Sequence, residues 1–305
     1  MTTKVKIKTN RNNKLKEEVL NIFRAMPYLL PFIILISFFV LWPIIYVFLT
    51  AFKERYSVWT GAYAGWGLEN FRDIFADRNF MGAIRNTFVY AFLVVPISTC
   101  IAIVIATLLN QKIKFRGLFQ TAFFLPMVTS ALAIGLAWRW LFHHRFGFFN
   151  YILSFFGVDP INWLQAHGMV VIVVFGIWNI LPFTIILLLS GLQNIDPLYY
   201  TAAKADGAKT LRTFFRITVP LLAPTIGLVL IVNMISSFRV FGELFPFFAG
   251  QPGFAGSLWT MVFYIFDMFF VRSRFGHAAA AALILFLITF VLTLIQLFIQ
   301  RKWRY

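Results

Sequence analysis

Residues 196–224 carry the densest set of polar and helix-terminating side chains inside an otherwise apolar chain. They read DPLYYTAAKADGAKTLRTFFRITVPLLAP and lie between two long apolar runs. The stretch is too polar to cross a bilayer, because charged side chains are costly at membrane depth. It is also too regularly punctuated by aspartate, proline and glycine to be a slack linker. The chemistry that it offers is binding, and we predict that it docks a partner.

The spacing of its capping residues predicts two short helices joined by a tight turn. Asp196 can cap a helix that begins at Pro197, because its carboxylate accepts from free amides and proline has no amide to leave unpaired. Gly207 can adopt the left-handed conformation that ends a helix, and Asp206 is placed to accept the amides that open the next one. A second helix then begins at Thr210. Two interpretations stay open: the pair seats in another subunit, or it covers the inner face of its own bundle.

Residues elsewhere in the sequence are not spaced for catalysis or for metal binding. The histidines lie near the ends of apolar runs without metal-like spacing, at His143, His144, His167 and His277. Cys100 is the single cysteine, no Ser/His/Asp or Cys/His arrangement can be argued, and no GxxxxGK[ST] phosphate loop occurs. We therefore predict a protein that is not an enzyme, that binds no metal and that holds no cofactor of its own.

The elements that position the polar stretch are predicted to be membrane helices. With 305 residues, 60% of them hydrophobic, and a mean hydropathy of +0.81, the chain lacks the polar surface of a soluble domain. Six apolar runs approach the ~20 residues that a helix needs to cross ~30 Å of hydrocarbon. They are residues 28–52, 87–109, 118–142, 169–192, 220–238 and 278–299. The predicted fold is an all-α integral membrane protein with six transmembrane helices.

The distribution of charge argues against nucleic-acid binding and sets the orientation in the membrane. The net charge of +16 comes from short segments beside the apolar runs. Seventeen basic and four acidic residues lie before the first run, after the last run, or within 110–117 and 193–219. The rest of the chain holds ten basic and seven acidic residues. The positive-inside rule therefore places the N-terminus, the C-terminus and residues 196–219 in the cytoplasm.

A further apolar stretch, residues 254–270, is short and contains Asp267. A crossing there would place the basic tail outside, so we interpret the stretch as an interfacial or re-entrant element on the outer side. The expected organisation is a basic cytoplasmic segment over residues 1–27, a six-helix domain over 28–300, and a basic cytoplasmic tail over 301–305. The six-helix domain includes the cytoplasmic hairpin, residues 196–219.

Polar and aromatic side chains at membrane depth are sparse, and they are the candidates for a solute pathway. They are Trp178, Asn179, Asn233, Ser236, Ser237 and Phe238. Amides and hydroxyls could bond a neutral polyol such as a sugar, while aromatic faces could cover its ring carbons. The alternative is that the amides only satisfy contacts between helices. Arg239 and Glu243, one turn apart, are expected to form a local ion pair.

The hairpin resembles the coupling loop of ATP-binding-cassette importer permeases, whose signature reads Glu-Ala-Ala, two residues, Asp-Gly-Ala and later Ile-x-x-Pro. The matching residues here are Ala202, Ala203, Asp206, Gly207, Ala208, Phe214, Ile217, Pro220 and Pro224. Residues 191–197, 125–126, 138–142 and 279–296 are similar to the sugar-permease branch. Thr201 stands where the family has glutamate, so that glutamate's salt bridge does not carry over, although a hydroxyl could keep a weaker hydrogen bond.

The resemblance implies a type I importer permease fold and a half-transporter in the bacterial cytoplasmic (inner) membrane. Such a permease pairs with a second, homologous permease and receives a carbohydrate from an extracytoplasmic solute-binding protein. It sits on two ATPase subunits, which bind ATP and Mg²⁺. The implied coupling residues are Pro197, Tyr200, Thr201, Ala202, Ala203, Asp206, Gly207, Ala208, Phe214, Ile217 and Pro220.

The competing hypothesis is a secondary carrier or channel that acts alone in the lipid. Such a protein needs buried carboxylates for ion coupling or a filter-like repeat. Glu243 and Asp267 are the only acids near the last two apolar runs, and both are peripheral to those runs.

Overall fold

The computed structural model describes residues 20, 26–111, 114–242, 244–248, 250–253 and 256–302. The predicted N-terminal segment 1–27 and the tail 301–305 therefore lie mostly outside the described residues. Glu243, the expected partner of Arg239, lies outside them as well.

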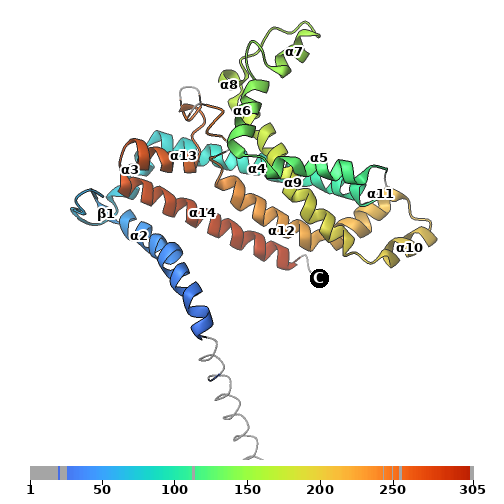
Figure 1. Cartoon of the computed structure of the whole chain (residues 1–305), viewed down its shortest axis with the longest axis horizontal. Helices are drawn as coiled ribbons and strands as arrows, with labels where there is room; N and C mark the ends of the chain where they lie inside the picture. Colours follow the sequence, from blue (N-terminus) through green and yellow to red (C-terminus); the bar gives the residue numbers. More distant parts are fainter. Residues whose placement is uncertain are drawn as a thin grey trace, which may run out of the picture.

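Helices make up most of the described structure, and β1 and β2 are two residues each (Figure 1). In chain order the elements are η1 (Ser37–Leu41), α2 (Trp42–Ala51), β1 (Lys53–Glu54), β2 (Gly65–Trp66), α3 (Glu69–Ala76), α4 (Arg78–Asn110), α5 (Arg116–Val128), α6 (Ala131–Leu141), α7 (Phe148–Ser154), α8 (Trp163–Ala166), α9 (Gly168–Gln193), α10 (Pro197–Ala205), α11 (Thr210–Thr213), η2 (Phe214–Thr218), α12 (Val219–Phe238), α13 (Met261–Phe266), η4 (Asp267–Val271) and α14 (Phe275–Lys302).

Five continuous helices in the described ranges are long and apolar enough to cross a membrane. They are Met26–Ala51, Arg78–Asn110, Gly168–Gln193, Thr210–Phe238 and Phe275–Arg301. The apolar stretch before the last of them forms only the short helix Met261–Val271, so it adds no crossing of that length. The all-α membrane fold predicted from hydropathy is confirmed.

The third predicted crossing, residues 118–142, differs from expectation because it is a bent pair. Helices α5 and α6 meet at an angle of 104°. Helix α5 ends at Thr129, whose backbone is extended, with φ −91° and ψ 147°. The Thr129 hydroxyl donates to Leu125 O at 3.0 Å, and its amide donates to Pro126 O at 3.3 Å, so the hydroxyl satisfies the carbonyl that the amide no longer reaches. Residues 118–142 therefore form a broken span or a re-entrant loop, and they count as the sixth crossing only if the bent pair is one span.

Helices α4, α9 and α12 form the centre of the bundle. Close approach of α4 to α9 depends on Gly176, because a Cβ there would lie 2.4 Å from the hydroxyl of Tyr90. Further along, Ala102 and Ala106 of α4 are fully buried among leucines that include Leu188 of α9. Small residues at such positions allow the close packing that holds membrane helices together.

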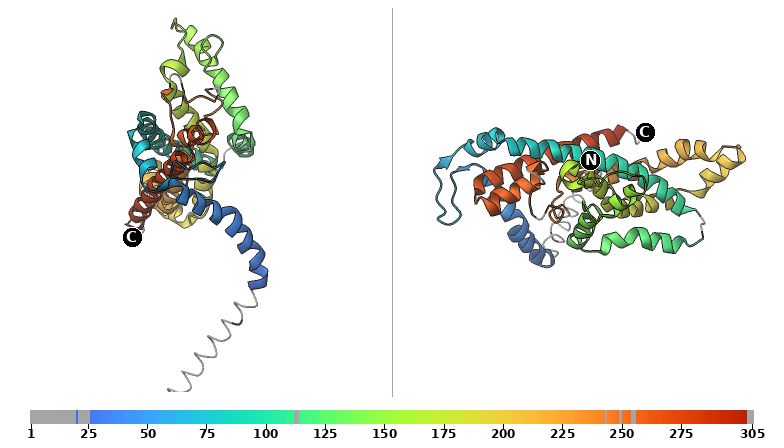
Figure 2. Two further views of the ribbon diagram at one scale, coloured as in Figure 1. Left: turned by 90° about the vertical axis from the view of Figure 1, so that its left-hand side faces the viewer. Right: turned by 90° about the horizontal axis from the view of Figure 1, so that it is seen from above.

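The first helix is peripheral, since the apolar window of Met26–Ala51 has no buried residue, and it leans away from the bundle (Figure 1). The hairpin α10–α11 lies at one end of the long axis, while β1, α3 and α13 lie at the other. Residues 142–167, called the arm, project to the side together with α6 (Figures 1 and 2).

Asp77 joins α13 to the start of α4. Its Oδ1 caps α4 by accepting from Asn79 N at 2.8 Å, and its Oδ2 accepts from the hydroxyl of Tyr264 at 2.9 Å. Burial and the neighbouring carboxylate raise the pKa of Tyr264 well above its ordinary value. The hydroxyl therefore stays protonated, and remains a donor, at any physiological pH.

The arm is held together by one buried side chain, Asn150. Its Nδ2 donates to the carbonyls of His144 and Ile161, both at 2.8 Å, while its Oδ1 accepts from Ile161 N at 3.2 Å and from Trp163 Nε1 at 2.8 Å. A single amide thus closes the loop between α7 and α8.

We predict that Asn150→Ala loosens the arm without unfolding the bundle. Removing the amide leaves its buried hydrogen-bond partners unpaired. Each unpaired group lowers the stability of the arm by roughly 1–3 kcal/mol. Hydrogen–deuterium exchange in nanodiscs should become faster in residues 142–167 and stay unchanged in α4 and α9. Ser154→Ala, at an exposed position of α7, is the control. Unchanged exchange in the arm of the Asn150→Ala variant would show that the Asn150 amide does not hold the arm together.

Candidate functional site

The first helix of the hairpin begins and ends as its sequence predicts. Asp196 Oδ1 accepts from Leu198 N at 2.8 Å, with Pro197 in the first turn. At the other end Gly207 has φ +70°, and two backbone bonds close the helix, from Gly207 N to Lys204 O and from Ala208 N to Ala203 O. This is the Schellman arrangement, which needs a left-handed residue at the glycine position. A Cβ on Gly207 would meet nothing within 4 Å, so the requirement is for backbone angles and not for space.

Asp206 does not act as predicted. Its backbone N–H bonds to Ala202 O at 3.0 Å, which completes the end of α10. Lys209 precedes the first residue of α11, and that position makes no side-chain capping bond. Among the described residues, the carboxylate of Asp206 takes no amide of the second helix, so the prediction that it opens that helix is wrong. The Schellman bonds organise the turn instead.

The second helix begins at Thr210, as predicted, and continues into the membrane span without a break. The turn Phe214–Thr218 is a π turn in which Val219 N–H reaches Phe214 O. Pro220 follows directly, and a proline cannot supply the next helical N–H. The same arrangement occurs in the first span, where Trp42 N–H reaches Ser37 O just before Pro43. A wide turn before the proline keeps each helix continuous.

One side of the hairpin faces its own bundle across a groove of about 780 Å³. Tyr200 and Lys204 of α10, Phe214 and Thr218 of the second helix, and Leu108 of α4 are among the residues that line it. The hydroxyls of Tyr200 and Thr218 lie 3.3 Å apart, and Ala203 is buried. The two helices of the hairpin are therefore joined to each other behind the Gly207 turn.

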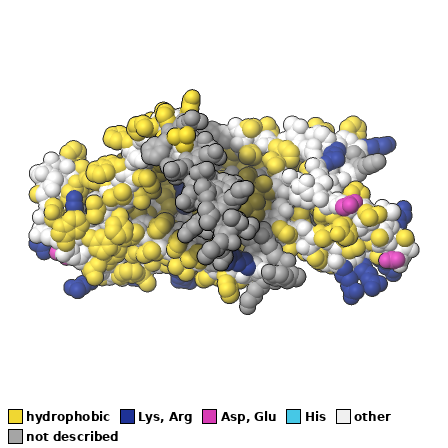
Figure 3. Space-filling view, turned by 90° about the horizontal axis from the view of Figure 1, so that it is seen from below, with side chains coloured by type: hydrophobic (Ala, Val, Ile, Leu, Met, Phe, Trp, Pro, Cys, Tyr) yellow, Lys and Arg dark blue, Asp and Glu magenta, His cyan; other side chains and the backbone are white. Residues whose placement is uncertain are grey.

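The other side presents apolar side chains to the surroundings. Leu198, Tyr199 and Phe215 do not line the groove, and their exposed fractions are 69%, 53% and 65%. Leu211 lines the groove and is 73% exposed. These four were not among the predicted coupling residues, although apolar positions in a segment too polar for the membrane were the available signal. Lys and Arg side chains gather at the same end of the molecule (Figure 3). Those of the hairpin are Lys204, Lys209, Arg212 and Arg216.

Thr201 is exposed, and its hydroxyl donates to Pro197 O at 3.1 Å within the same helix. While the Thr201 hydroxyl donates to Pro197 O, its oxygen can only accept a hydrogen bond from a partner subunit. The weaker hydrogen bond expected for Thr201 must then have its donor on the partner. Ala202, Ile217 and Pro220 lie along the same hairpin, with Ala202 and Pro220 exposed and Ile217 half-buried.

Two of the predicted pathway residues are parts of the core. Asn233 is 2% exposed, and its Nδ2 donates to the hydroxyl of Thr184 at 2.8 Å, which joins α12 to α9. Phe238 is fully buried and packs edge-on against Phe88 of α4, with ring centroids 5.0 Å apart. Packing within the chain occupies both side chains in this structure. For Asn233 this is the contact between helices that was the stated alternative, and a pathway role for the two residues stays a prediction.

The other four predicted pathway residues are divided between packing and surface. Ser237 is buried, and Trp178 is half-buried against Trp138 and Phe175. Asn179 is half-buried and Ser236 is exposed. Trp178, Asn179 and Ser236 are therefore the three of the six that are not fully buried, and their pathway role stays a prediction.

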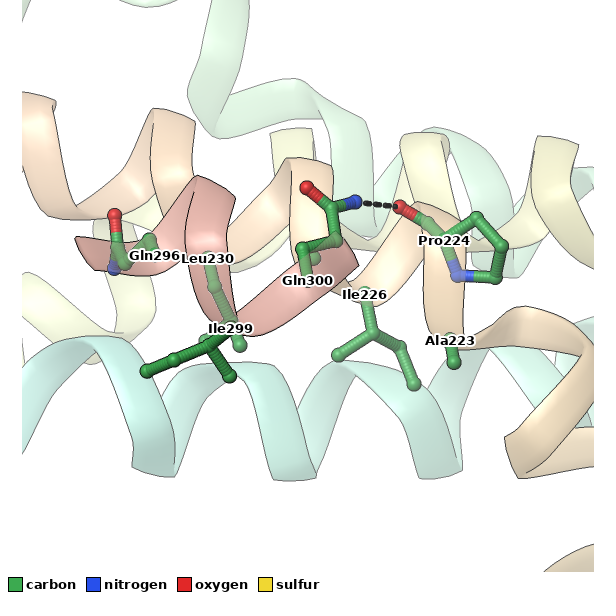
Figure 4. Close-up of a pocket in the computed structure, with 8 residues that line it drawn as sticks. Ala223, Pro224, Ile226, Leu230, Gln296, Ile299 and Gln300 are labelled. Atoms are coloured by element: carbon green, nitrogen blue, oxygen red, sulfur yellow. Dashed lines mark hydrogen bonds between the residues drawn. The ribbon is translucent and has the colours of Figure 1, made fainter. Parts of the chain in front are cut away.

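A small apolar pocket of about 160 Å³ lies between α12 and α14 near the hairpin (Figure 4). Gln300 Nε2 crosses it to the carbonyl of Pro224 at 3.0 Å. Gly227 makes room for this bond, since a Cβ there would lie 2.4 Å from Gln300 Nε2. The bond links the membrane end of the hairpin helix to the last span.

The described residues contain no group of three or more His, Cys, Asp and Glu side chains that could hold a metal ion. What the hairpin presents is a groove towards its own bundle and exposed apolar side chains outside that groove.

Comparison with known families decides what kind of docking element this is. Residues 98–305 match the family described as binding-protein-dependent transport system inner membrane component. The chain belongs to this family. The hairpin lies inside the matched region, and the resemblance to importer permeases drawn from its residues is confirmed.

The relatives of this permease are transport proteins, and the similarity covers most of their length. It is 32% identical to the arabinooligosaccharides transport system permease protein AraP of Bacillus subtilis (strain 168), over 90% of this chain and 88% of that protein. It is also 32% identical to the lactose transport system permease protein LacF of Rhizobium radiobacter, over 90% and 93%. A chain of a bacterial ABC transporter for import of the acidic polysaccharide alginate shares its fold, with a TM-score of 0.82, 24% identity, and coverage of 95% and 99%.

For this permease we predict that Asn233→Ala and Thr184→Val each destabilise the detergent-solubilised protein by about 0.5–1.5 kcal/mol, the range for hydrogen bonds between membrane helices. The double variant should cost less than the sum, because both substitutions remove the same bond. Thermal denaturation followed by circular dichroism measures this, with Ser236→Ala as the exposed control on the same helix. Additive losses would show that the two side chains do not depend on each other.

Proposed function

We propose that this permease forms, together with a second permease, the pathway by which a carbohydrate enters a bacterial cell, driven by ATPase subunits that seat the hairpin. In this proposal both termini and the hairpin are cytoplasmic, and the membrane is the bacterial inner membrane. ATP and Mg²⁺ belong to the partner subunits. The cargo arrives on an extracytoplasmic binding protein, as the family description implies.

The observation that carries the proposal is the build of the hairpin. It is capped by Asp196, closed at Gly207, and continuous with a membrane span through the π turn before Pro220. It also exposes apolar side chains outside the groove that faces its own bundle, as at Leu198 and Phe215. A carrier or channel acting alone has no use for a rigid element whose exposed apolar groups do not pack on its own bundle.

The cargo class is supported by the relatives, whose names specify arabinooligosaccharides and lactose. We propose an oligosaccharide on that ground. Neutral hydroxyl-rich molecules also agree with the scarcity of ionisable side chains inside the apolar runs.

The experiment that tests the proposal is purification in mild detergent, with identification of the subunits that co-elute, followed by reconstitution in vesicles. Uptake of radiolabelled arabinotriose or lactose should need the second permease, the ATPase, the binding protein and ATP together. Vesicles that hold this chain alone should accumulate nothing. Uphill accumulation by the single chain would favour the secondary carrier instead.

Gly207→Val should disable coupling and leave membrane insertion intact. A β-branched residue in the left-handed region costs roughly 1–2 kcal/mol, which corresponds to a factor of about 5–30 in the population of the correct turn. Uptake in the reconstituted complex should fall by a similar factor. Gly207→Asn is the matched control, because asparagine tolerates these angles. Full uptake by the valine variant would mean that the turn does not transmit force.

A further inference from the structure

A cavity of about 580 Å³ lies where α6 and α8 meet the loop that joins α12 to α13. Figure 1 shows that loop beside α6 and α8, away from the hairpin end of the molecule. Its polar lining comes from Arg139, Asn162, Gln165 and Gln251, and the aromatic part from Phe247 and Phe248. None of these residues belongs to the pathway predicted from the sequence.

The polar groups are held in place by the surrounding chain. Arg139 Nη1 donates to the carbonyl of Pro246 at 3.5 Å, and Asn162 Nδ2 donates to Gln165 Oε1 at 2.7 Å. Gln251 follows Gly250, and Gly253 closes the turn by donating its amide to Gln251 O at 2.9 Å. Both glycines have positive φ, and a Cβ on Gly253 would lie 2.7 Å from Leu258 Cβ. The positive φ angles of the two glycines and the close contact with Leu258 therefore fix the backbone conformation on both sides of Gln251.

This combination of groups suits a saccharide. Carboxamides donate and accept at once, and a guanidinium offers several donors in one plane, so together they match neighbouring hydroxyl groups of a sugar. The described lining contains no lysine and no acid, and its volume falls in the range of ~300–1,000 Å³ found for small-molecule sites.

A protein partner fits the cavity less well. Interfaces are anchored by large aromatic or apolar side chains that become buried on binding. Here Phe247 is already buried, with 1% exposed, and the exposed lining groups are the amides of Asn162, Gln165 and Gln251.

We propose that this cavity is an outer subsite that binds one sugar unit of an oligosaccharide before the chain enters the membrane pathway. The inference rests on the proposed function, which makes this the extracytoplasmic side and the cargo a carbohydrate. It adds a site at the mouth of the permease, built from the arm and the α12–α13 loop.

Local thiol protection tests the subsite in the reconstituted complex. The single native cysteine is replaced by Cys100→Ala, and Leu164→Cys places a thiol in the lining of the cavity while all four polar groups remain. Arabinotriose or lactose should slow labelling by a charged methanethiosulfonate about threefold at twice its dissociation constant. Ala166→Cys on the same short helix, outside the lining, should show no protection, and adding Gln251→Leu to Leu164→Cys should abolish it.

Two outcomes would overturn the subsite. The first is ATP-driven uptake by the Leu164→Cys complex without any protection by the transported saccharide. The second is protection by the binding protein free of saccharide, which would assign the cavity to protein docking. Protection without any ATP-driven uptake would support the subsite and count against the proposed function, so the two failures are distinguishable.

Discussion

The continuity of the helix from Thr210 to Phe238 is the constraint on which the rest of the structure depends. In lipid every backbone polar group needs a partner within the protein, so a span cannot simply break where it leaves the membrane. The π turn before Pro220 keeps the ladder intact at that point. The second helix of the hairpin and α12 are therefore one continuous helix. The Asn233–Thr184 bond ties this helix to α9, and the Gln300–Pro224 bond ties it to α14.

The bent pair α5–α6 shows where the same constraint is relaxed. The hydroxyl of Thr129 donates to Leu125 O, the carbonyl that the Thr129 amide would bond in a continuous helix. Helix α6 then leaves at an angle of 104° to α5. This bend sends α6 and the arm sideways, towards the α12–α13 loop, where Arg139 reaches Pro246. A polar cavity at the rim of the bundle is the direct result of a helix that does not run straight through.

The sequence was sufficient where structure is decided locally. The cap at Asp196, the left-handed Gly207 and the start at Thr210 depend on residues within one or two turns, and short-range rules predict them. Hydropathy gives the number of apolar segments but not the direction of the chain, so the bend at Thr129 was missed. The burial of Asn233 and Phe238 could not be predicted, because it depends on Thr184 and Phe88, which are far away in the chain. The outer cavity was missed for the same reason, since its lining comes from three separate segments.

The scarcity of charge within the spans fits the proposed mechanical coupling. An ion-driven carrier couples through ionisable groups that change partners at membrane depth. In the described part of the chain, the ion pairs Arg55–Glu69, Arg272–Asp267 and His277–Asp73 all lie outside the five continuous spans, apart from His277 in the first turn of the last one. The proposed coupling to ATPase subunits needs no such groups, because force applied to the hairpin would open and close the bundle. That proposal requires the turn at Gly207 to be stiff, while the contacts with a neutral saccharide stay weak and numerous. Amide and hydroxyl groups provide contacts of that kind, because each bond to a sugar replaces a similar bond to water.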